Sequence, residues 1–442
     1  MKGNLESLVE RVRQRAADTA EAALREAARR MRSGEEDLGQ VERQVRDSMR
    51  PISAEVLSGA LETMGNGKER CHRPCECGGT LRYLSDRAKT LQTLLGPLEM
   101  KRAYYHCARC GKGQAPLARR LGVEGTRLSP ALQEAMAFAE AEMPYERASH
   151  FLQRVAGLAL SKDTYEVLAG TLGQAVLPQE IERARRAWEL LPPAEDFYLS
   201  CDGLKVNTLE GWKEPKVGAI FRARPDAEGR PIRGPTQYLA HLEPAEEFGQ
   251  RLWQWAEALG LRRARRVVVL GDGAPWIWNL ARTYFPGAIE IVDYYHAAEH
   301  LAELSKALWG EGTPQADRWI EAAKALLWNG KIEALLGLLK KLAPRPCALR
   351  ERLRLEIGYF AENQERMRYD RFRQKGLFIG SGVVEAACKS VVGHRFKQSG
   401  MRWSRQGLLH LLHLRLCILN GHWDDFARSY YPRLTNLQAA YF

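Results

Sequence analysis

The sequence has no hydrophobic stretch long enough to cross a membrane. No run approaches the roughly 18 uninterrupted apolar residues of a helical span, and even Leu408–Leu419 carries His410, His413 and Arg415. We therefore expect no transmembrane segment and no membrane partner. The first 50 residues also lack the apolar core of a secretory signal peptide, which predicts a cytoplasmic protein.

Cysteine is scarce: there are nine in 442 residues, an odd number. Without a signal peptide these cysteines are expected to be metal ligands or buried thiols, and a disulfide framework is excluded. A disordered composition is also absent, because 45% of the residues are hydrophobic and 27% are charged, as in globular domains. The length has room for roughly two to four domains.

The chain is basic, with 66 Lys and Arg against 54 Asp and Glu and a net charge of +12. Such an excess suits an anionic partner. Met1–Arg50 does not supply it, because this segment holds 11 basic and 10 acidic residues. Arg366–Arg405 holds ten basic and two acidic residues, interleaved with Tyr369, Phe372, Phe396 and Trp403. This stripe suits binding to a nucleic-acid backbone; a solvated basic face is the alternative.

Four of the cysteines form two closely spaced pairs that flank a β-rich segment. Cys75 and Cys77 precede it, and Cys107 and Cys110 follow it. Three short strands are predicted between the pairs, with a turn at Gly96-Pro97: Thr80–Leu84, Thr90–Leu95 and Leu98–Tyr105. The pattern predicts a zinc ribbon whose four thiolates hold a structural Zn²⁺ ion. Cys71 is an alternative ligand, and buried free thiols are the alternative to a metal site.

The next segment has the pattern of a helix-turn-helix. Ser129–Ala141 and Tyr145–Ala156 are amphipathic, a turn follows at Gly157-Leu158, and Ser161 is placed to cap a further helix. In a helix-turn-helix the last helix enters the major groove of DNA. A plain helical hairpin is equally compatible with the pattern.

From residue 196 the chain predicts a mixed α/β core. Three strands come first, then a helix at Pro244–Leu259, then two strands of the buried parallel type; the strands are Phe197–Gly203, Lys216–Arg222, Thr236–Leu242, Arg265–Gly271 and Ala288–Val292. This order describes a ribonuclease-H-like core, in which the first and fourth strands are neighbours. Asp202 and Asp272 would then face each other where these strands end.

Paired carboxylates repel unless a cation neutralises them, and Mg²⁺ is held by one or two carboxylates together with substrate phosphates. Glu385 supplies a third acid, on a helix that Ser381 would cap. It lies among Val383, Val384, Ala386 and Ala387, a setting that suits a ligand pressed against a core. The alternative is an exposed pair of Glu385 with Lys389.

Three segments that carry these acids resemble the signatures of the DDE transposases: Ser200–Gly203, Leu270–Trp278 and Gly380–Glu385. The closest group is the transposases of bacterial insertion sequences in the Mutator-like superfamily, Kra-type branch. Its members also carry an N-terminal cysteine motif and a stretch similar to His394–Trp403. The resemblance covers roughly residues 70–425.

The resemblance implies that Asp202, Asp272 and Glu385 hold two Mg²⁺ or Mn²⁺ ions, with Asp202 bridging both. It implies cleavage of element ends in double-stranded DNA and joining of the 3′-hydroxyls to target DNA, by a homodimer or larger assembly near the bacterial nucleoid. In relatives a histidine follows an acid or cysteine by three residues after the fifth strand. Asp293 and His296 match, so His296 is a candidate DNA contact or a structural histidine.

Five further side chains are candidate DNA contacts in the basic stripe: Lys389, Arg395, Lys397, Arg402 and Trp403. The expected organisation is multidomain α/β: a charged helical arm (1–68), a β zinc ribbon (69–120), a helix-turn-helix-like DNA-binding region (121–190) and the catalytic domain (191–442). An all-α insertion is expected within the last domain at about 297–376, where Ala297–Leu342 has a helical pattern.

The sequence is also compatible with three hypotheses other than a transposase. His296, Glu299 and His300 fit the H-x-x-E-H pattern of inverted zinc peptidases, but this leaves the paired acids unexplained. A non-catalytic DNA-binding protein would keep the ribbon and the helix-turn-helix without using the acids. A nuclease or resolvase would use the same core.

Overall fold

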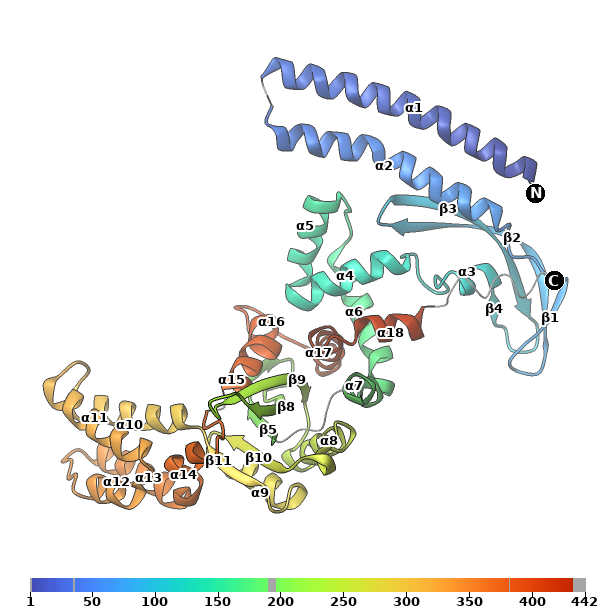
Figure 1. Cartoon of the computed structure of the whole chain (residues 1–442). Helices are drawn as coiled ribbons and strands as arrows, with labels where there is room; N and C mark the ends of the chain where they lie inside the picture. Colours follow the sequence, from blue (N-terminus) through green and yellow to red (C-terminus); the bar gives the residue numbers. More distant parts are fainter. Residues whose placement is uncertain (1, 35, 190–195, 381, 432–442) are drawn as a thin grey trace. The chain divides into compact units, whose positions relative to one another are not determined.

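The computed structural model describes residues 2–34, 36–189, 196–380 and 382–431, and it describes the backbone but not the side chains of residues 2–4, 384 and 385 (Figure 1). The contacts divide the chain into two units, residues 1–169 with 424–442 and residues 170–423. Among the described helices, none combines the length and the apolar character that a membrane span requires.

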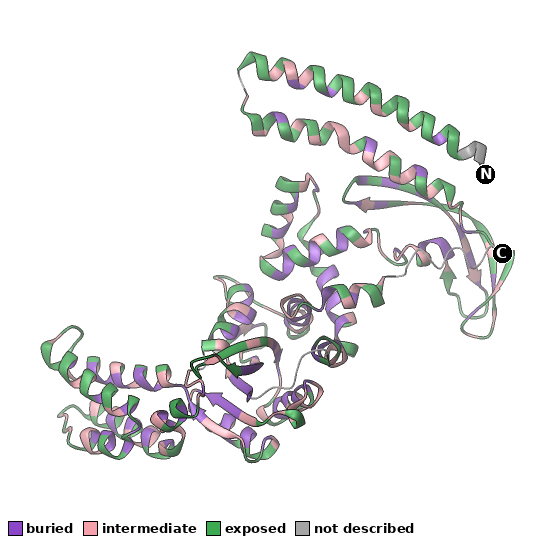
Figure 2. Ribbon diagram, viewed as in Figure 1, coloured by how far each residue is buried: buried purple, intermediate pink, exposed green. Residues whose placement is uncertain are grey.

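The first unit begins with a pair of helices, where the sequence predicted a charged helical arm. The helices α1 (Lys2–Ser33) and α2 (Leu38–Thr63) pack through a few small and aliphatic side chains, including Leu8, Ala27 and Val41. Asp37 begins α2 by accepting the backbone N–H of Gln40 at 2.9 Å. Most of the hairpin surface is exposed (Figure 2).

A four-stranded antiparallel sheet follows, in the order β1-β2-β3-β4: β1 (His72–Pro74), β2 (Thr80–Thr93), β3 (Gly96–Cys107) and β4 (Gly113–Gln114). The prediction of three short strands between the cysteine pairs was wrong. The first two are one strand, β2, because the polar stretch Ser85–Lys89 continues to pair with β3. The turn lies at Leu94-Leu95, and Gly96 already belongs to β3.

Helices complete the first unit: α3 (Pro116–Arg120), α4 (Pro130–Glu142), α5 (Tyr145–Ala156), the first half of α6 (Lys162–Val176), and α18 (Trp423–Tyr430). Ser129 caps α4: its side chain accepts the backbone N–H of Leu132. Gly157 ends α5 in the left-handed region, with φ of 61°. Ser161 accepts the N–H of Thr164 at 3.4 Å where α6 begins.

The second unit is built on a mixed five-stranded sheet in the order β11-β10-β5-β8-β9. Its strands are β5 (Asp196–Gly203), β8 (Lys216–Pro225), β9 (Pro231–His241), β10 (Arg266–Gly271) and β11 (Ile289–Val292). β5, β10 and β11 are parallel, and β8 and β9 run antiparallel to their neighbours. The first and fourth predicted strands, β5 and β10, are therefore neighbours, as expected.

Helices cover both faces of this sheet (Figure 1). They are α7 (Glu180–Glu189), α8 (Ala245–Ala258), α9 (Pro275–Tyr284), α15 (Gly382–Ala387), a π-helical turn (Cys388–Gly393), α16 (His394–Phe396) and α17 (Arg405–Leu419). Short 3₁₀ turns lie at Leu177–Gln179, Leu261–Arg263 and Gln364–Met367. A small hairpin, β6 (Val206–Thr208) and β7 (Gly211–Lys213), was not predicted. The central strands are buried (Figure 2), which explains their apolar sequences.

The expected helical insertion follows β11. It consists of α10 (Tyr294–Trp309), α11 (Pro314–Trp328), α12 (Ile332–Lys340), α13 (Cys347–Glu362) and α14 (Tyr369–Gln374). Its core is continuous with that of the sheet through residues such as Leu301, Leu335 and Phe360. The buried Tyr369 hydroxyl donates to the carbonyl of Val292 at 3.0 Å and so joins α14 to β11.

One ion pair joins the beginnings of the two central parallel strands. Asp196 and Arg266 are register partners in β5 and β10, and the guanidinium contacts both carboxylate oxygens at 2.5 and 2.7 Å. The Asp196 side chain is only 3% exposed. A buried carboxylate that loses its partner is strongly destabilising.

We expect Arg266→Gln to lower the free energy of unfolding by about 3 kcal/mol, because it leaves the Asp196 carboxylate buried without a cation. Chemical denaturation of the purified chain measures this loss. The double change Arg266→Met with Asp196→Leu should recover most of it, since no buried charge remains. Equal losses in the single and double variants would contradict this account.

Candidate functional site

Two acids lie side by side where the central parallel strands end. The last register pair of β10 with β5 is Leu270 with Ser200. Asp272 and Asp202 each lie two residues beyond that pair. Parallel strands end at the same edge of a sheet, which is where ligands bind in open α/β folds. The β5–β10 pairing therefore brings together the two aspartates expected from the sequence.

Both carboxylates are held by backbone N–H groups. Gly203 donates to Oδ1 of Asp202 at 2.6 Å, and Ala274 donates to Oδ1 of Asp272 at 2.8 Å. Both residues are half-buried, and within the described chain no basic side chain forms an ion pair with either. Burial raises the pKa of Asp202, and repulsion from Asp272 raises it further. Adjacent carboxylates without a cation fit a site for a hard divalent metal.

The helix that contains position 385 packs on β5, the strand that carries Asp202. α15 contacts β5 and β8, and Cys388, at the start of the π-helical turn, donates a hydrogen bond from its thiol to the Asp202 carboxylate. Cys388 lies one turn after position 385. π-helical turns within helices frequently occur at functional sites. The Glu385 side chain and Ser381 lie outside the described residues, so the roles predicted for them stay predictions.

A third aspartate follows the next strand of the same edge. Asp293 comes directly after β11, is 3% exposed, and receives the N–H groups of Tyr295 and His296 at 2.6 and 3.1 Å. It is thus the N-cap of α10. This cap fixes His296 at the edge, close enough to Asp202 that a positive charge on the imidazole lowers the pKa of that carboxyl.

His296 belongs to a chain of contacts from the insertion that the sequence did not predict. Its Nε2 lies 3.2 Å from Nε2 of His300, whose Nδ1 lies 2.8 Å from the Glu356 carboxylate. The His300 ring stacks on Tyr359 with centroids 4.3 Å apart. The Tyr359 hydroxyl donates to the carbonyl of Asp272 at 2.9 Å. The only sequence signal for these contacts is the i,i+4 spacing of His296 and His300, which places both on one face of a helix.

These contacts do not support the zinc-peptidase hypothesis. The Glu299 side chain is 72% exposed, and Glu356 engages the His300 nitrogen that points away from His296. Among the side chains that the structure describes, only a group of cysteines brings three or more metal-ligand atoms within 4.8 Å of one another. The two histidines therefore lack a third described ligand.

The five expected DNA contacts divide into exposed and structural residues. Lys389, Lys397 and Arg402 are exposed. Arg395 is fully buried, and its guanidinium lies 5.1 Å from the Trp403 ring centroid. Buried this way it has no surface to offer to DNA, so we do not keep the expectation that it contacts the DNA backbone.

Trp403 also has a structural role. It is half-buried, its indole N–H donates to the carbonyl of Phe396 at 3.1 Å, and its backbone pairs with Thr208 of β6. A stacking role for it in DNA binding stays a prediction.

Much of the basic stripe is likewise used within the protein. Arg366 pairs with Glu290 at 2.5 Å, and Arg368 pairs with Glu333 and Glu365. Arg373 lies 4.0 Å from the centroid of the Trp328 ring. The net charge of Arg366–Arg405 therefore overstates the charge that this stripe presents to a partner.

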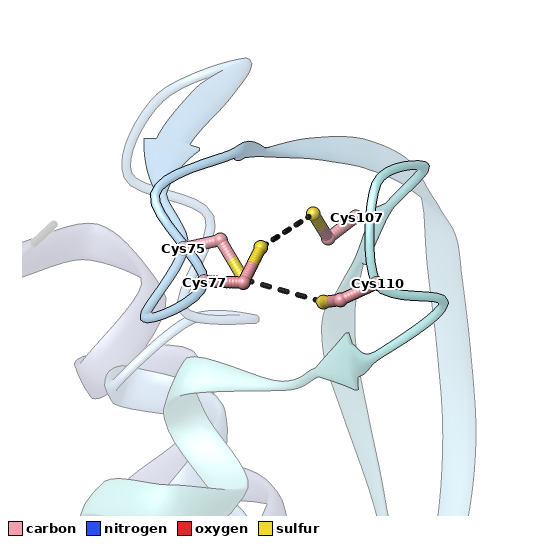
Figure 3. A group of neighbouring side chains, drawn as sticks. All are labelled: Cys75, Cys77, Cys107 and Cys110. Carbon is pink, nitrogen blue, oxygen red and sulfur yellow. Dashed lines mark hydrogen bonds between the residues drawn. The ribbon is translucent and has the colours of Figure 1, made fainter.

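The four predicted zinc ligands form one cluster, drawn in Figure 3. Sγ of Cys75 lies 3.7 Å from that of Cys110, and Sγ of Cys77 lies 3.7 Å from that of Cys107. Zn–S bonds of about 2.3 Å in a tetrahedron place two sulfurs about 3.8 Å apart. The cluster thus fits a structural Zn²⁺ ion. Cys71 is exposed and lies outside it.

The local backbone prepares these thiols to bind a metal. Gly78 and Gly111, with φ of 77° and 71°, close the two turns that carry the cysteine pairs. The N–H of Cys110 hydrogen-bonds to the Cys107 thiolate, and such bonds lower the pKa of Cys107 to about 6. A thiolate, not a thiol, is the metal ligand.

The two helices of the predicted helix-turn-helix are α5 and α6, but the charge on the second helix is unfavourable for DNA. The exposed residues of the first turns of α6 are Lys162, Asp163, Glu166 and Val167. Two carboxylates on the surface that would enter the major groove repel phosphates. The surface charge of α6 therefore gives no support to a DNA contact there.

We expect the purified chain to contain one zinc ion, and Cys107→Ser to lose it, because a structural site needs all four thiolates. Elemental analysis of the purified chain measures its zinc content, and thermal melting of the same chain measures the loss of stability. Cys71→Ser is the matched control and should keep the metal. Loss of zinc in the Cys71 variant alone would contradict the assignment of ligands.

Comparisons with known proteins place the chain in a family. A family model described as "Uncharacterised protein family (UPF0236)" matches residues 37–427. The "UPF0236 protein in vanSb 3'region" of Streptococcus gallolyticus is 22% identical over 343 residues, which cover 73% of this chain and 70% of that protein.

A solved structure, the "Drosophila P element transposase strand transfer complex", matches 66% of this chain and 80% of its own chain, with 8% identity and a TM-score of 0.24. A score this low does not establish a common fold. The family match, by contrast, spans most of the chain and both of its units. The chain belongs to the uncharacterised protein family UPF0236.

Proposed function

We propose that this chain is a DNA transposase of the DDE type, which cleaves element ends and joins their 3′-hydroxyls to target DNA. The observation that carries the proposal is the placement of Asp202 and Asp272 at adjacent ends of β5 and β10, without a described basic partner. The sheet order β11-β10-β5-β8-β9 is the order expected of a ribonuclease-H-like core. The helix with position 385 packs on β5, which is where a third acid would be needed.

Asp202, Asp272 and Glu385 would hold the divalent ions, Mg²⁺ or Mn²⁺. When bound, such ions neutralise the carboxylates and stabilise the attacking and leaving oxygens of an in-line phosphoryl displacement. The chain's own contribution is positioning. Gly203 and Ala274 fix one oxygen of each aspartate through backbone N–H groups, and the Cys388 thiol also donates to the Asp202 carboxylate, so both carboxylates are oriented before a metal binds.

The proposed reaction has two displacements at phosphorus. Water first breaks the bond between a phosphate and the 3′-oxygen at the element end, which leaves a 3′-hydroxyl. That hydroxyl then attacks a phosphate of the target DNA and releases a target 3′-oxygen. Neither step needs a protein nucleophile, so catalysis depends on positioning and charge neutralisation.

Exposed cations near the site are suited to hold the DNA backbone. Lys389 follows Cys388 directly, and Lys397 and Arg402 flank the turn after α16. His296, which the Asp293 cap holds in place, is a further candidate to contact a DNA phosphate or base. Two element ends must be brought together, so we also propose a dimer or larger assembly.

We expect Asp202→Asn and Asp272→Asn each to reduce cleavage of a labelled element-end duplex by about a thousandfold or more, since each removes part of a site worth several kcal/mol in the transition state. DNA affinity without added Mg²⁺ or Mn²⁺ should change little. Glu210→Gln, an exposed acid on the β6–β7 hairpin, is the control and should cleave normally. Full cleavage by either asparagine variant would overturn the proposal.

Metal binding gives a second readout that does not depend on activity. Mn²⁺ should raise the melting temperature of the intact chain, because it binds the folded state and relieves the repulsion between the aspartates. The rise should be absent in Asp202→Asn. An equal rise in both proteins would show that Mn²⁺ binds elsewhere.

We expect His300→Gln to lower the cleavage rate by about tenfold, because His300 orients His296 through a 3.2 Å contact and is itself oriented by Glu356. Rates should be measured across pH, since a loss of orientation alters the pH profile, whereas a loss of stability lowers it uniformly. His150→Gln, a histidine of α5 remote in sequence, serves as the control. An unchanged rate and profile would remove His300 from the site.

A further inference from the structure

The segment that contains the cysteine cluster, with its flanking residues, carries as much net positive charge as the basic stripe. Residues 68–127 contain 13 basic and 5 acidic residues, a net charge of +8. In a sheet, what matters is which face each residue occupies, because side chains alternate along a strand and directly opposed residues share a face. The pairing of β1, β2 and β3 therefore decides where this charge lies.

The register gathers basic residues on one face near the cysteine end of the hairpin. Arg87 lies opposite Arg102, and Arg82 lies between His72 on β1 and His106 on β3. Between these rows, Ser85 lies opposite Tyr104. We call this surface the arginine face and define it by these residues: His72, Arg82, Arg87, Arg102, Tyr104 and His106.

A bulge creates this arrangement. The register shifts between Tyr83 and Ser85, so that Leu84 is an extra residue on β2. Without the shift, Asp86 would lie opposite Arg102 and neutralise it. With the shift, Asp86 lies opposite Ala103 on the other face, where Nδ2 of Asn66 donates to both of its carboxylate oxygens at 2.9 Å.

The three arginines of this face lack acidic partners. Within the described chain, the side chains of Arg82, Arg87 and Arg102 form no ion pair and no hydrogen bond, and Nε of Arg102 is buried without a partner. The Arg87 guanidinium lies 3.6 Å from the centroid of the Tyr104 ring, which holds it over the face. By contrast, Arg13, Arg25 and Arg29 of α1 all pair with glutamates.

We propose that the arginine face binds the phosphate backbone of double-stranded DNA. Like charges directly opposed across two strands are destabilising, and an external polyanion relieves that repulsion. Guanidinium groups match phosphates in geometry and charge. Arg82 and Arg87 are five residues apart along β2, about 16 Å, so the face spans several nucleotides of one strand.

The choice of DNA as the polyanion rests on the proposed function, whereas the anionic character of the partner rests on the face alone. The neighbouring cysteine cluster fixes this end of the hairpin, since Cys107 directly follows His106 and lies opposite Leu81. The face is therefore held in place before a partner arrives, which reduces the entropic cost of binding.

The test uses the full, zinc-loaded chain with Asp202→Asn and no added Mg²⁺ or Mn²⁺, so that its outcome is independent of catalysis. Fluorescence anisotropy measures binding to a labelled duplex over a range of salt concentrations. Replacing Arg82, Arg87 and Arg102 together by Gln should reduce the slope of log K against log salt by about 2.7, since each phosphate contact contributes about 0.9. At 0.15 M salt the affinity should fall about a hundredfold.

The matched control replaces Arg13, Arg25 and Arg29 by Gln, which makes the same change in net charge on α1, where each arginine already has a glutamate partner. Its slope should stay within one unit of the parent's. Equal slopes in the two triple variants would overturn the proposal. So would tighter binding of the parent to a double-stranded RNA of the same sequence, which would make RNA the partner.

Zinc content reports whether the ribbon still folds. If the triple variant loses zinc, the same salt titration is made with the single variant Arg87→Gln, whose side chain is exposed. Its slope should fall by about one unit with zinc retained, and an unchanged slope would overturn the proposal.

Discussion

The repulsion between Asp202 and Asp272 is the constraint on which the second unit depends. Both carboxylates lie at one edge of the sheet because the two strands that carry them are parallel neighbours. No cationic side chain that the structure describes forms an ion pair with either carboxylate. Six residues earlier on each strand, Asp196 and Arg266 attract one another in a buried ion pair. The same two strands are thus joined by an ion pair where they begin and carry two carboxylates that repel each other where they end. The ion pair and the hydrophobic core hold the strands together in spite of the carboxylates.

The helical insertion takes part in this arrangement as well as covering the sheet. Tyr359 of α13 donates to the Asp272 carbonyl, and Gly273, with φ of 103°, leaves room for its ring, since a Cβ there would lie 2.5 Å from it. The buried Asp293 begins α10 and fixes His296. Loss of these contacts would release the ends of β10 and β11, so the insertion and the acidic edge depend on one another.

The sequence was sufficient to predict the features that depend on a local residue pattern. It was not sufficient for the features that depend on which side chains become neighbours in the fold. Apolar runs that end in Asp-Gly were sufficient for β5 and β10, and cysteine spacing was sufficient for the cluster. Charge counted along the chain was misleading, because Arg395 is buried against Trp403 and Arg366 pairs with Glu290. The arginine face escaped detection because it depends on a single bulge residue, Leu84, which no composition reveals.

Both units therefore contain like charges held together by a rigid framework. On β5 and β10 the charges are carboxylates, and on β2 and β3 they are guanidinium groups. Each arrangement costs folding free energy that hydrophobic burial and the four-thiolate cluster must offset. A divalent cation would relieve the repulsion between the carboxylates, and a phosphate backbone would relieve the repulsion between the guanidinium groups. Under the proposed function, DNA and the divalent cations bound with it would relieve both repulsions, so a single proposed substrate would account for both clusters of like charge.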